Sequence, residues 1–185
     1  MHKPKCFLDM DGVLADFVSA SCAAHGRPSP YENGGGRGVF DIERLWGISA
    51  EEFWGPTDNL HFWKGIKKMP DADDICAKVC DAFGEENVAI LTSPSQHPSC
   101  IEGKRWWIKE YYPQFSSRII FGSAKHFLAH KGSYLVDDRD KNIEDFERHG
   151  GNGVLVPRYW NRMYLDSDLV IPMIDGQIRH HMEIA

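Results

Sequence analysis

The sequence has no excess of positive charge and no cysteine pattern typical of a disulfide framework. Its 21 Lys and Arg residues stand against 27 Asp and Glu residues, which gives a formal net charge of −6. This balance disfavours a general nucleic-acid or anionic-membrane binder, because such a protein needs a basic face. The five cysteines are odd in number and include no CxxC pair. We therefore expect free thiols.

Long apolar runs are also missing. No segment reaches the roughly 18 apolar residues of a membrane span. Near the N-terminus, Asp9 and Asp11 interrupt the apolar stretch that a signal peptide needs. The 185 residues are 42% hydrophobic and 26% charged, the balance of a folded domain. These features predict a cytoplasmic protein with no membrane partner.

Short apolar runs alternate with segments of helical periodicity, a pattern typical of a parallel α/β sheet. The predicted strands are 6–8, 87–91, 118–121, 134–136 and 153–156. The predicted helices are 13–24, 71–83, 99–112 and 141–149. We expect an α/β fold with about five parallel strands.

Residues 26–70 break this alternation. They contain the glycine cluster Gly34–Gly36 and the capping-box pattern Ser49-Ala50-Glu51-Glu52. We expect a small helical cap at 17–75, inserted into a core formed by 1–16 and 76–185. Seven aromatic residues lie in this region: Tyr31, Phe40, Trp46, Phe53, Trp54, Phe62 and Trp63.

Two acidic residues, Asp9 and Asp11, stand at the end of the first predicted strand. Side chains alternate along a strand, so the two share a face if the backbone stays extended. A turn at Gly12 then lets both lean over the strand's carboxyl end. In open α/β sheets this edge is where ligands bind. One carboxylate would suffice to cap the next helix, so the pair indicates a binding or catalytic site.

A second acidic pair, Asp137 and Asp138, follows the predicted strand 134–136. If this strand lies near the first, four carboxylates converge, and their repulsion requires a cation or shared protons. Ligation by oxygen alone, with open positions, suits Mg²⁺. The pattern of charges thus favours a magnesium site.

Two further segments are suited to phosphate. The strand 87–91 ends in Thr92-Ser93-Pro94-Ser95, which offers hydroxyls and backbone N–H groups. Lys125 follows the next strand and could neutralise phosphate charge. Either feature alone is more often a turn or a solvated lysine. Together with the two acidic pairs, in this order, they favour a phosphate site.

In this order the four groups resemble the motifs of the haloacid dehalogenase superfamily: Asp9-Met10-Asp11-Gly12, Leu91-Thr92-Ser93, Lys125 and Leu135-Val136-Asp137-Asp138. Within it, the sequence is similar to the 5'(3')-deoxyribonucleotidase family of cytosolic and mitochondrial deoxy-pyrimidine 5'-nucleotidases. That likeness rests on 9–17, Thr92-Ser93-Pro94, Cys100, Lys104, Trp107 and Asp137-Asp138-Arg139. The resemblance spans roughly residues 5–157. It implies a Rossmann-like three-layer core with a small helical cap inserted after the first strand.

The resemblance also implies a Mg²⁺-dependent phosphatase with an aspartyl-phosphate intermediate. Asp9 would be the nucleophile and Asp11 the general acid and base. The Asp9 carboxylate, the Asp11 backbone carbonyl and Asp138 would hold Mg²⁺, with Asp137 behind them. The phosphoryl oxygens would be bound by Thr92, Ser93 and Lys125.

The spacing of the motifs shows where the cap is inserted and restricts the class of substrate. Thr92 follows Asp11 by 81 positions, whereas Lys125 follows Thr92 by only 33, so the insertion lies after the first motif. A cap there favours small phosphate esters. By position in the family, the residues expected to contact the nucleobase are Phe17, Trp54 and Phe40. Alternatively, these rings form the cap's own core, as we expect for Trp46, Phe53, Phe62 and Trp63.

One position departs from the family, because Ser123 stands where mammalian members carry an arginine two residues before the motif lysine. Lys104 is expected on a helix surface. The expected partner is a nucleoside monophosphate, in first place a 5'-deoxyribonucleotide, and not a nucleic acid. The apolar segment 169–171 leaves a homodimer open.

Three other functions stay open at this point. The first is a phosphatase for another small ester, such as a sugar phosphate. The second is a non-catalytic nucleotide-binding protein on the same fold, against which the paired Asp9 and Asp11 argue, because a binder needs no nucleophile and acid together. The third is a polynucleotide phosphatase, which would need a basic groove.

Overall fold

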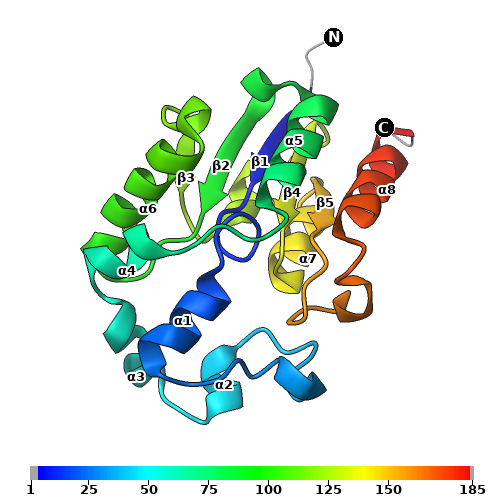
Figure 1. Ribbon diagram of the computed structural model, residues 1–185. Helices are drawn as coiled ribbons and strands as arrows, with labels where there is room; N and C mark the ends of the chain where they lie inside the picture. Colours follow the sequence, from blue (N-terminus) through cyan, green and yellow to red (C-terminus); the bar gives the residue numbers. More distant parts are fainter. Residues whose placement is uncertain (1–3, 184–185) are drawn as a thin grey trace.

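A computed structural model describes residues 4–183, which are built around a five-stranded parallel sheet (Figure 1). The strand order is β3-β2-β1-β4-β5. The strands are β1 (Lys5–Leu8), β2 (Val88–Thr92), β3 (Ile119–Phe121), β4 (Ser133–Asp137) and β5 (Asn152–Leu155). All five predicted strands are confirmed to within one residue at each end.

Helices cover both faces of the sheet and make three layers. The α-helices are α1 (Phe17–His25), α2 (Ile42–Trp46), α3 (Ala50–Trp54), α4 (Leu60–Gly65), α5 (Ala72–Phe83), α6 (Pro98–Tyr111), α7 (Asp140–Arg148) and α8 (Val170–Glu183). Alternate strand residues point to opposite layers: Cys6 and Leu8 pack with α5, α6 and α8, whereas Phe7 packs with α7. The predicted α/β class with five parallel strands is confirmed.

The first predicted helix, 13–24, is wrong at its start. Residues 10–15 form a tight loop in which the N–H groups of Leu14 and Ala15 both donate to the Met10 carbonyl, at 2.8 Å each. The helix α1 begins only at Phe17, because the Asp16 carboxylate accepts a hydrogen bond from the Ser19 N–H and caps it. The helix α8 was not predicted.

The chain leaves and re-enters the sheet layer through two paired linkers. The Asp16 N–H donates to the Lys67 carbonyl, and the Met69 N–H donates to the Leu14 carbonyl, each at 2.8 Å. Between these linkers lie α1 to α4, and Figure 1 shows α1, α2 and α3 beyond the carboxyl ends of the strands. The expected boundary at residue 75 falls inside α5. We propose residues 17–66 as the inserted segment.

The inserted segment has a small hydrophobic cluster of its own. The buried members are Tyr31, Ile42 and Phe53, joined by Trp160 from the chain after β5. The predicted capping box is present at α3, where Ser49 and Glu52 exchange hydrogen bonds. A second contact ties the segment to the sheet layer, because Trp63 of α4 packs on α6 at Gly103.

Two findings bear on the exclusions drawn from the sequence. None of the helices in residues 4–183 is long and apolar enough to cross a membrane. All five cysteines are free thiols, as expected.

The contact between α4 and α6 gives a test of this packing. A Cβ on Gly103 would lie 2.3 Å from the Trp63 Cβ and 3.4 Å from its Cα, so rotating the indole cannot relieve the clash. Gly103→Ala should therefore lower the free energy of unfolding by about 1–3 kcal/mol. Gly176→Ala, in α8 with nothing within 4 Å, should raise it by about 0.5–1 kcal/mol. Chemical denaturation of both variants measures the two signs, and equal stabilisation would contradict the packing.

Candidate active site

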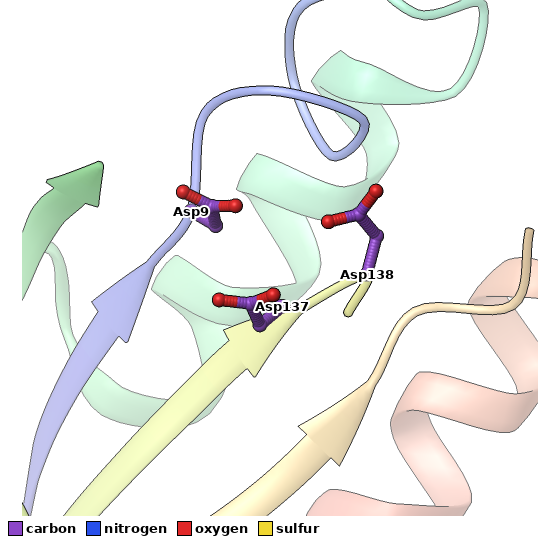
Figure 2. Close-up of side chains that lie close together, drawn as sticks. All are labelled: Asp9, Asp137 and Asp138. Carbon is purple, nitrogen blue, oxygen red and sulfur yellow. The ribbon is translucent and has the colours of Figure 1, made fainter. Parts of the chain in front are cut away.

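Three buried carboxylates meet where β1 and β4 end (Figure 2). Asp9 follows β1 and Asp137 ends β4, and these strands are parallel neighbours with Leu8 opposite Val136. One carboxylate oxygen from each of Asp9, Asp137 and Asp138 lies within 4.8 Å of the others. The register of the two strands thus brings together residues that are far apart in the sequence.

One buried lysine partly offsets this charge. Lys125 donates to Asp9 Oδ1 at 2.7 Å and to Asp137 Oδ2 at 2.6 Å, and its side chain is 2% exposed. Burial opposes the charged form of this lysine, but the charges of Asp137 and Asp9 and their hydrogen bonds outweigh it, so the pKa of Lys125 is raised. Lys125 therefore stays protonated between the two carboxylates.

The remaining negative charge is not balanced by Lys125 alone. Burial, followed by the charges of Asp137 and Asp11, raises the pKa of Asp9 to about 7 even though Lys125 lowers it. Burial and the charges of Asp137 and Asp9 also raise the pKa of Asp138. Three carboxylates, of which Lys125 contacts only two, offer oxygen as the only donor type and fit a hard divalent cation such as Mg²⁺. The residues present therefore suit the expected metal.

Asp11 lies apart from this cluster and pairs with a second buried lysine. Lys104 Nζ is 2.5 Å from Asp11 Oδ2 and donates at 2.7 Å to both Thr92 Oγ1 and the Ser93 carbonyl. In the described part of the chain, Asp11 Oδ1 is buried with no hydrogen-bond partner. Asp11 thus has one oxygen fixed by a lysine and one oxygen free.

The expectation that Lys104 lies on a helix surface is wrong, because its side chain is completely buried. The sequence held a signal for this. The buried residues of α6 recur at the three- and four-residue spacing of one helix face, and Lys104 falls on that face: Cys100, Gly103, Lys104, Trp107 and Ile108. A lysine on an apolar face needs buried acceptors, and Asp11 and Thr92 supply them.

A cavity of about 320 Å³ opens above the carboxylates. Asp9, Asp11, Asp138, Ser93 and Ser123 are among the polar residues that line it. Its aromatic lining consists of Phe17, Phe40, Phe53, Trp54, Trp63 and Trp160. The three rings expected near a base all line this cavity, and so do Phe53 and Trp63, which were expected to pack only.

Phe17 is the centre of the aromatic part. Its ring stacks on Trp63 with centroids 5.7 Å apart at 19° and meets Trp54 at 6.0 Å and 37°. Phe53 and Phe62 approach its edge at 6.3 Å and 6.0 Å. These rings therefore support one another, and all of them except Phe62 also form a wall of the cavity.

Residues 158–161, after β5, complete the site and were missed in the sequence. The Arg158 guanidinium, 5% exposed, donates through Nε to the Gly12 carbonyl at 2.6 Å and forms two hydrogen bonds with Asp71 at 2.7 and 2.9 Å. Asn161 Nδ2 donates to the backbone carbonyl of Asp138 at 2.8 Å. No periodicity or motif marks this irregular segment, so sequence reasoning had no signal for it.

Comparison with known proteins gives one family. The model of a family described as 5' nucleotidase, deoxy (pyrimidine), cytosolic type C protein matches residues 3–169. The human 5'(3')-deoxyribonucleotidase, cytosolic type, is 28% identical over 145 residues, covering 74% of this chain and 71% of its own. The 5'(3')-deoxyribonucleotidase of Bacillus subtilis is 23% identical over 146 residues, covering 76% and 78%.

Solved structures with a similar backbone identify the fold of this chain. A haloacid dehalogenase family hydrolase from Deinococcus radiodurans, with bound phosphate and sodium, aligns with a TM-score of 0.53 at 12% identity, covering 86% of this chain and 84% of that one. A haloacid dehalogenase-like hydrolase from Streptococcus pneumoniae aligns with a TM-score of 0.51 at 11% identity, covering 97% and 91%. At this identity the likeness shows the fold alone.

The turn after Asp11 gives a test of the carboxylate geometry. Gly12 has φ +73°, and a Cβ there would lie 2.0 Å from Asp138 Oδ2. Gly26 has φ +59° with nothing within 4 Å. Gly26→Ala and Gly12→Ala should both lower the free energy of unfolding by roughly 1–2 kcal/mol, because alanine is strained in the left-handed conformation. Only Gly12→Ala should also weaken Mg²⁺ binding, by about 10-fold or more in calorimetric titration, because it displaces Asp138. Equal Mg²⁺ affinities in the two variants would contradict this.

Proposed function

Because the chain belongs to the family of cytosolic type C 5' nucleotidases, deoxy (pyrimidine), we propose that it hydrolyses nucleoside monophosphates, with 5'-deoxyribonucleotides preferred. Membership makes it a phosphoric monoester hydrolase, and its fold is that of the haloacid dehalogenases. The observation that carries the substrate proposal is the single cavity that joins the carboxylates to the aromatic wall. A phosphate ester with a flat apolar group fits both ends of it.

Asp9 would be the nucleophile. Its carboxylate lines the cavity, and Lys125 fixes its Oδ1. Attack of a carboxylate oxygen on phosphorus would form an aspartyl-phosphate and break the bond to the ester oxygen, which leaves as an alkoxide. Water would then cleave the acyl phosphate and release inorganic phosphate.

Asp11 would act as the acid and then the base. Lys104 holds its Oδ2, and the partnerless Oδ1 would carry the proton that the leaving alkoxide takes up. In the second step the same oxygen would accept a proton from the attacking water. The buried lysine keeps this carboxylate beside the cavity without blocking both of its oxygens.

The carboxylates of Asp9 and Asp138 and the backbone carbonyl of Asp11 would hold Mg²⁺. When bound, the ion would withdraw negative charge from the phosphoryl oxygens. Asp137 is better suited to a supporting role, because both of its oxygens already accept hydrogen bonds, from Lys125 and from Asn142. Its charge would still add to the field that attracts the cation.

The phosphoryl oxygens would be bound by Ser93, Thr92 and Lys125. Ser93 lines the cavity directly. The Thr92 hydroxyl accepts from Lys104, which leaves its own O–H to donate. Lys125 brings the positive charge nearest to Asp9. These donors would stabilise charge as it develops on the phosphoryl group.

The nucleobase would lie against Phe17, Trp54 and Phe40. All three line the cavity, and Phe17 and Trp54 are held at fixed tilt by neighbouring rings. Stacking on aromatic side chains contributes about 1–3 kcal/mol per base. A sugar phosphate has no flat apolar group for this wall, which favours nucleotides over sugar phosphates.

The role of Asp9 can be tested with Asp9→Asn. The amide keeps the size of the side chain but cannot attack phosphorus, so phosphate release should fall by about 1000-fold or more. Thermal unfolding should show a folded protein, because the change removes one of the repelling charges. Asp74→Asn, on the exposed surface of α5, should keep full activity. Unchanged phosphate release by Asp9→Asn would refute this nucleophile.

The substrate class can be tested with a panel of phosphate esters in the presence of Mg²⁺. Ribo- and deoxyribonucleotides with 5' or 3' phosphate are compared with glucose 6-phosphate and glycerol phosphate. We expect the highest kcat/KM for 5'-deoxyribonucleotides. A preference for sugar phosphates over every nucleotide would exclude the proposed substrate class.

The aromatic wall can be separated from the chemistry in the same assay. Trp54→Ala should raise KM for nucleotides by roughly 5- to 150-fold, the equivalent of about 1–3 kcal/mol of stacking. The same variant should hydrolyse glycerol phosphate as the wild-type protein does.

A further inference from the structure

One indole N–H reaches into the carboxylate cluster from the segment after β5. Trp160 Nε1 donates to Asp138 Oδ2 at 2.6 Å, and the Trp160 side chain is buried, with 6% of the residue exposed. Trp160 also lines the cavity. It lies 22 positions beyond Asp138 in the chain.

This hydrogen bond divides the two oxygens of Asp138 between two tasks. Oδ2 faces the turn at Gly12, where an added Cβ would lie 2.0 Å away, and it accepts from the indole. Figure 2 shows one oxygen of Asp138 pointing toward Asp9 and the other pointing away. An oxygen that is already bound to an N–H is fixed in place, so the carboxylate presents its remaining oxygen to the neighbouring aspartates.

The ring of the same tryptophan belongs to the inserted segment's hydrophobic cluster. Its centroid is 5.5 Å from that of Tyr31, and Ile42 and Phe53 are the other buried members. The Tyr31 hydroxyl in turn donates to the Val39 carbonyl at 3.0 Å, next to Phe40 of the cavity. One side chain therefore touches the carboxylate cluster with its N–H and the inserted segment with its ring.

The backbone around Trp160 is held firmly. Asn161 Nδ2 donates to the carbonyls of Asp138 and Val156, both at 2.8 Å. Arg158 is tied to the Gly12 carbonyl and to Asp71, at the start of α5. These contacts leave the indole little freedom to move independently of Asp138.

We propose that Trp160 is a positioning residue that orients Asp138 for Mg²⁺ and couples metal binding to the packing of the inserted segment. The inference rests on the proposed function, because it takes Asp138 as a ligand of the ion. Groups that hold a metal ligand in place typically account for 10- to 100-fold in metal affinity. The coupling is reciprocal: an ion that fixes Asp138 also fixes Trp160 against Tyr31.

The first experiment measures Mg²⁺ affinity directly, by isothermal titration calorimetry of the metal-free protein. Trp160→Phe keeps an aromatic ring in the cluster but removes the N–H, and it should weaken Mg²⁺ binding by about 10-fold or more. Trp46→Phe is the matched control, since Trp46 packs against the same cluster and makes no contact with the carboxylates. It should bind Mg²⁺ as the wild-type protein does.

Activity supplies a second measurement on the same variants. A residue that acts only by positioning the ion's ligand should change the Mg²⁺ concentration that gives half-maximal rate. The rate at saturating Mg²⁺ should recover to a large part of the wild-type value. A Trp160→Phe variant with unaltered Mg²⁺ affinity and dependence would overturn the proposal.

Asp138→Asn separates this proposal from the one on which it rests. If Asp138→Asn binds Mg²⁺ like the wild-type protein, the assignment of Asp138 as a ligand fails, and the role of Trp160 fails with it. If Asp138→Asn loses binding while Trp160→Phe retains it in full, only the role of Trp160 is refuted.

Hydrogen exchange of the wild-type protein tests the coupling even if Trp160→Phe does not fold. Adding Mg²⁺ should slow amide exchange around Tyr31, whose ring packs against that of Trp160. Amide exchange in the second half of α8 should stay unchanged, since no residue of that helix belongs to the hydrophobic cluster around Tyr31 and Trp160. Equal exchange around Tyr31 with and without Mg²⁺ would contradict the coupling.

Discussion

The mutual repulsion of Asp9, Asp137 and Asp138 is the constraint on which this site depends. Parallel pairing of β1 with β4 brings the three together at the sheet edge, and burial removes the water that would screen them. Lys125 bridges two of the three and leaves Asp138 to the N–H of Trp160. Lys125 supplies positive charge to Asp9 and Asp137, and the hydrogen bond from Trp160 fixes the position of Asp138. A divalent cation is the natural complement of this arrangement.

Most of the fold could be predicted from the sequence, because its strands are short, apolar and bounded by turn residues. The closeness of Asp9 and Asp138 follows from the predicted strands, because residues that come directly after neighbouring parallel strands lie at the same edge of the sheet. Helix α1 begins later than the periodicity predicts, because Asp16 caps it. The charge of Lys104 favours a surface position, but its place in the apolar repeat of α6 puts it on the buried face.

The contacts of residues 158–161 could not be predicted in the same way. Arg158, Trp160 and Asn161 lie in an irregular segment, and their partners are Gly12, Asp71 and Asp138, between 22 and 146 positions away. No periodicity links residues across such distances when neither strand nor helix sets the register. The ends of the inserted segment are hidden from sequence reasoning for a related reason. The linkers are paired by backbone hydrogen bonds between Leu14–Asp16 and Lys67–Met69, which leave no mark in side-chain composition.

The side chains that line the cavity carry mostly negative charge. The residues that line it include five carboxylates, on Asp9, Asp11, Asp41, Glu43 and Asp138, and one guanidinium, on Arg139. Arg139 is already engaged: its guanidinium lies 4.5 Å from the ring of Phe40 and 3.9 Å from Asp41. Ser123 also lines the wall and adds no charge to it. A phosphate dianion thus meets a surface that repels it until a cation is present. Under the proposed function, attraction of the substrate would therefore depend on a cation held by these carboxylates and on the side chains that orient them.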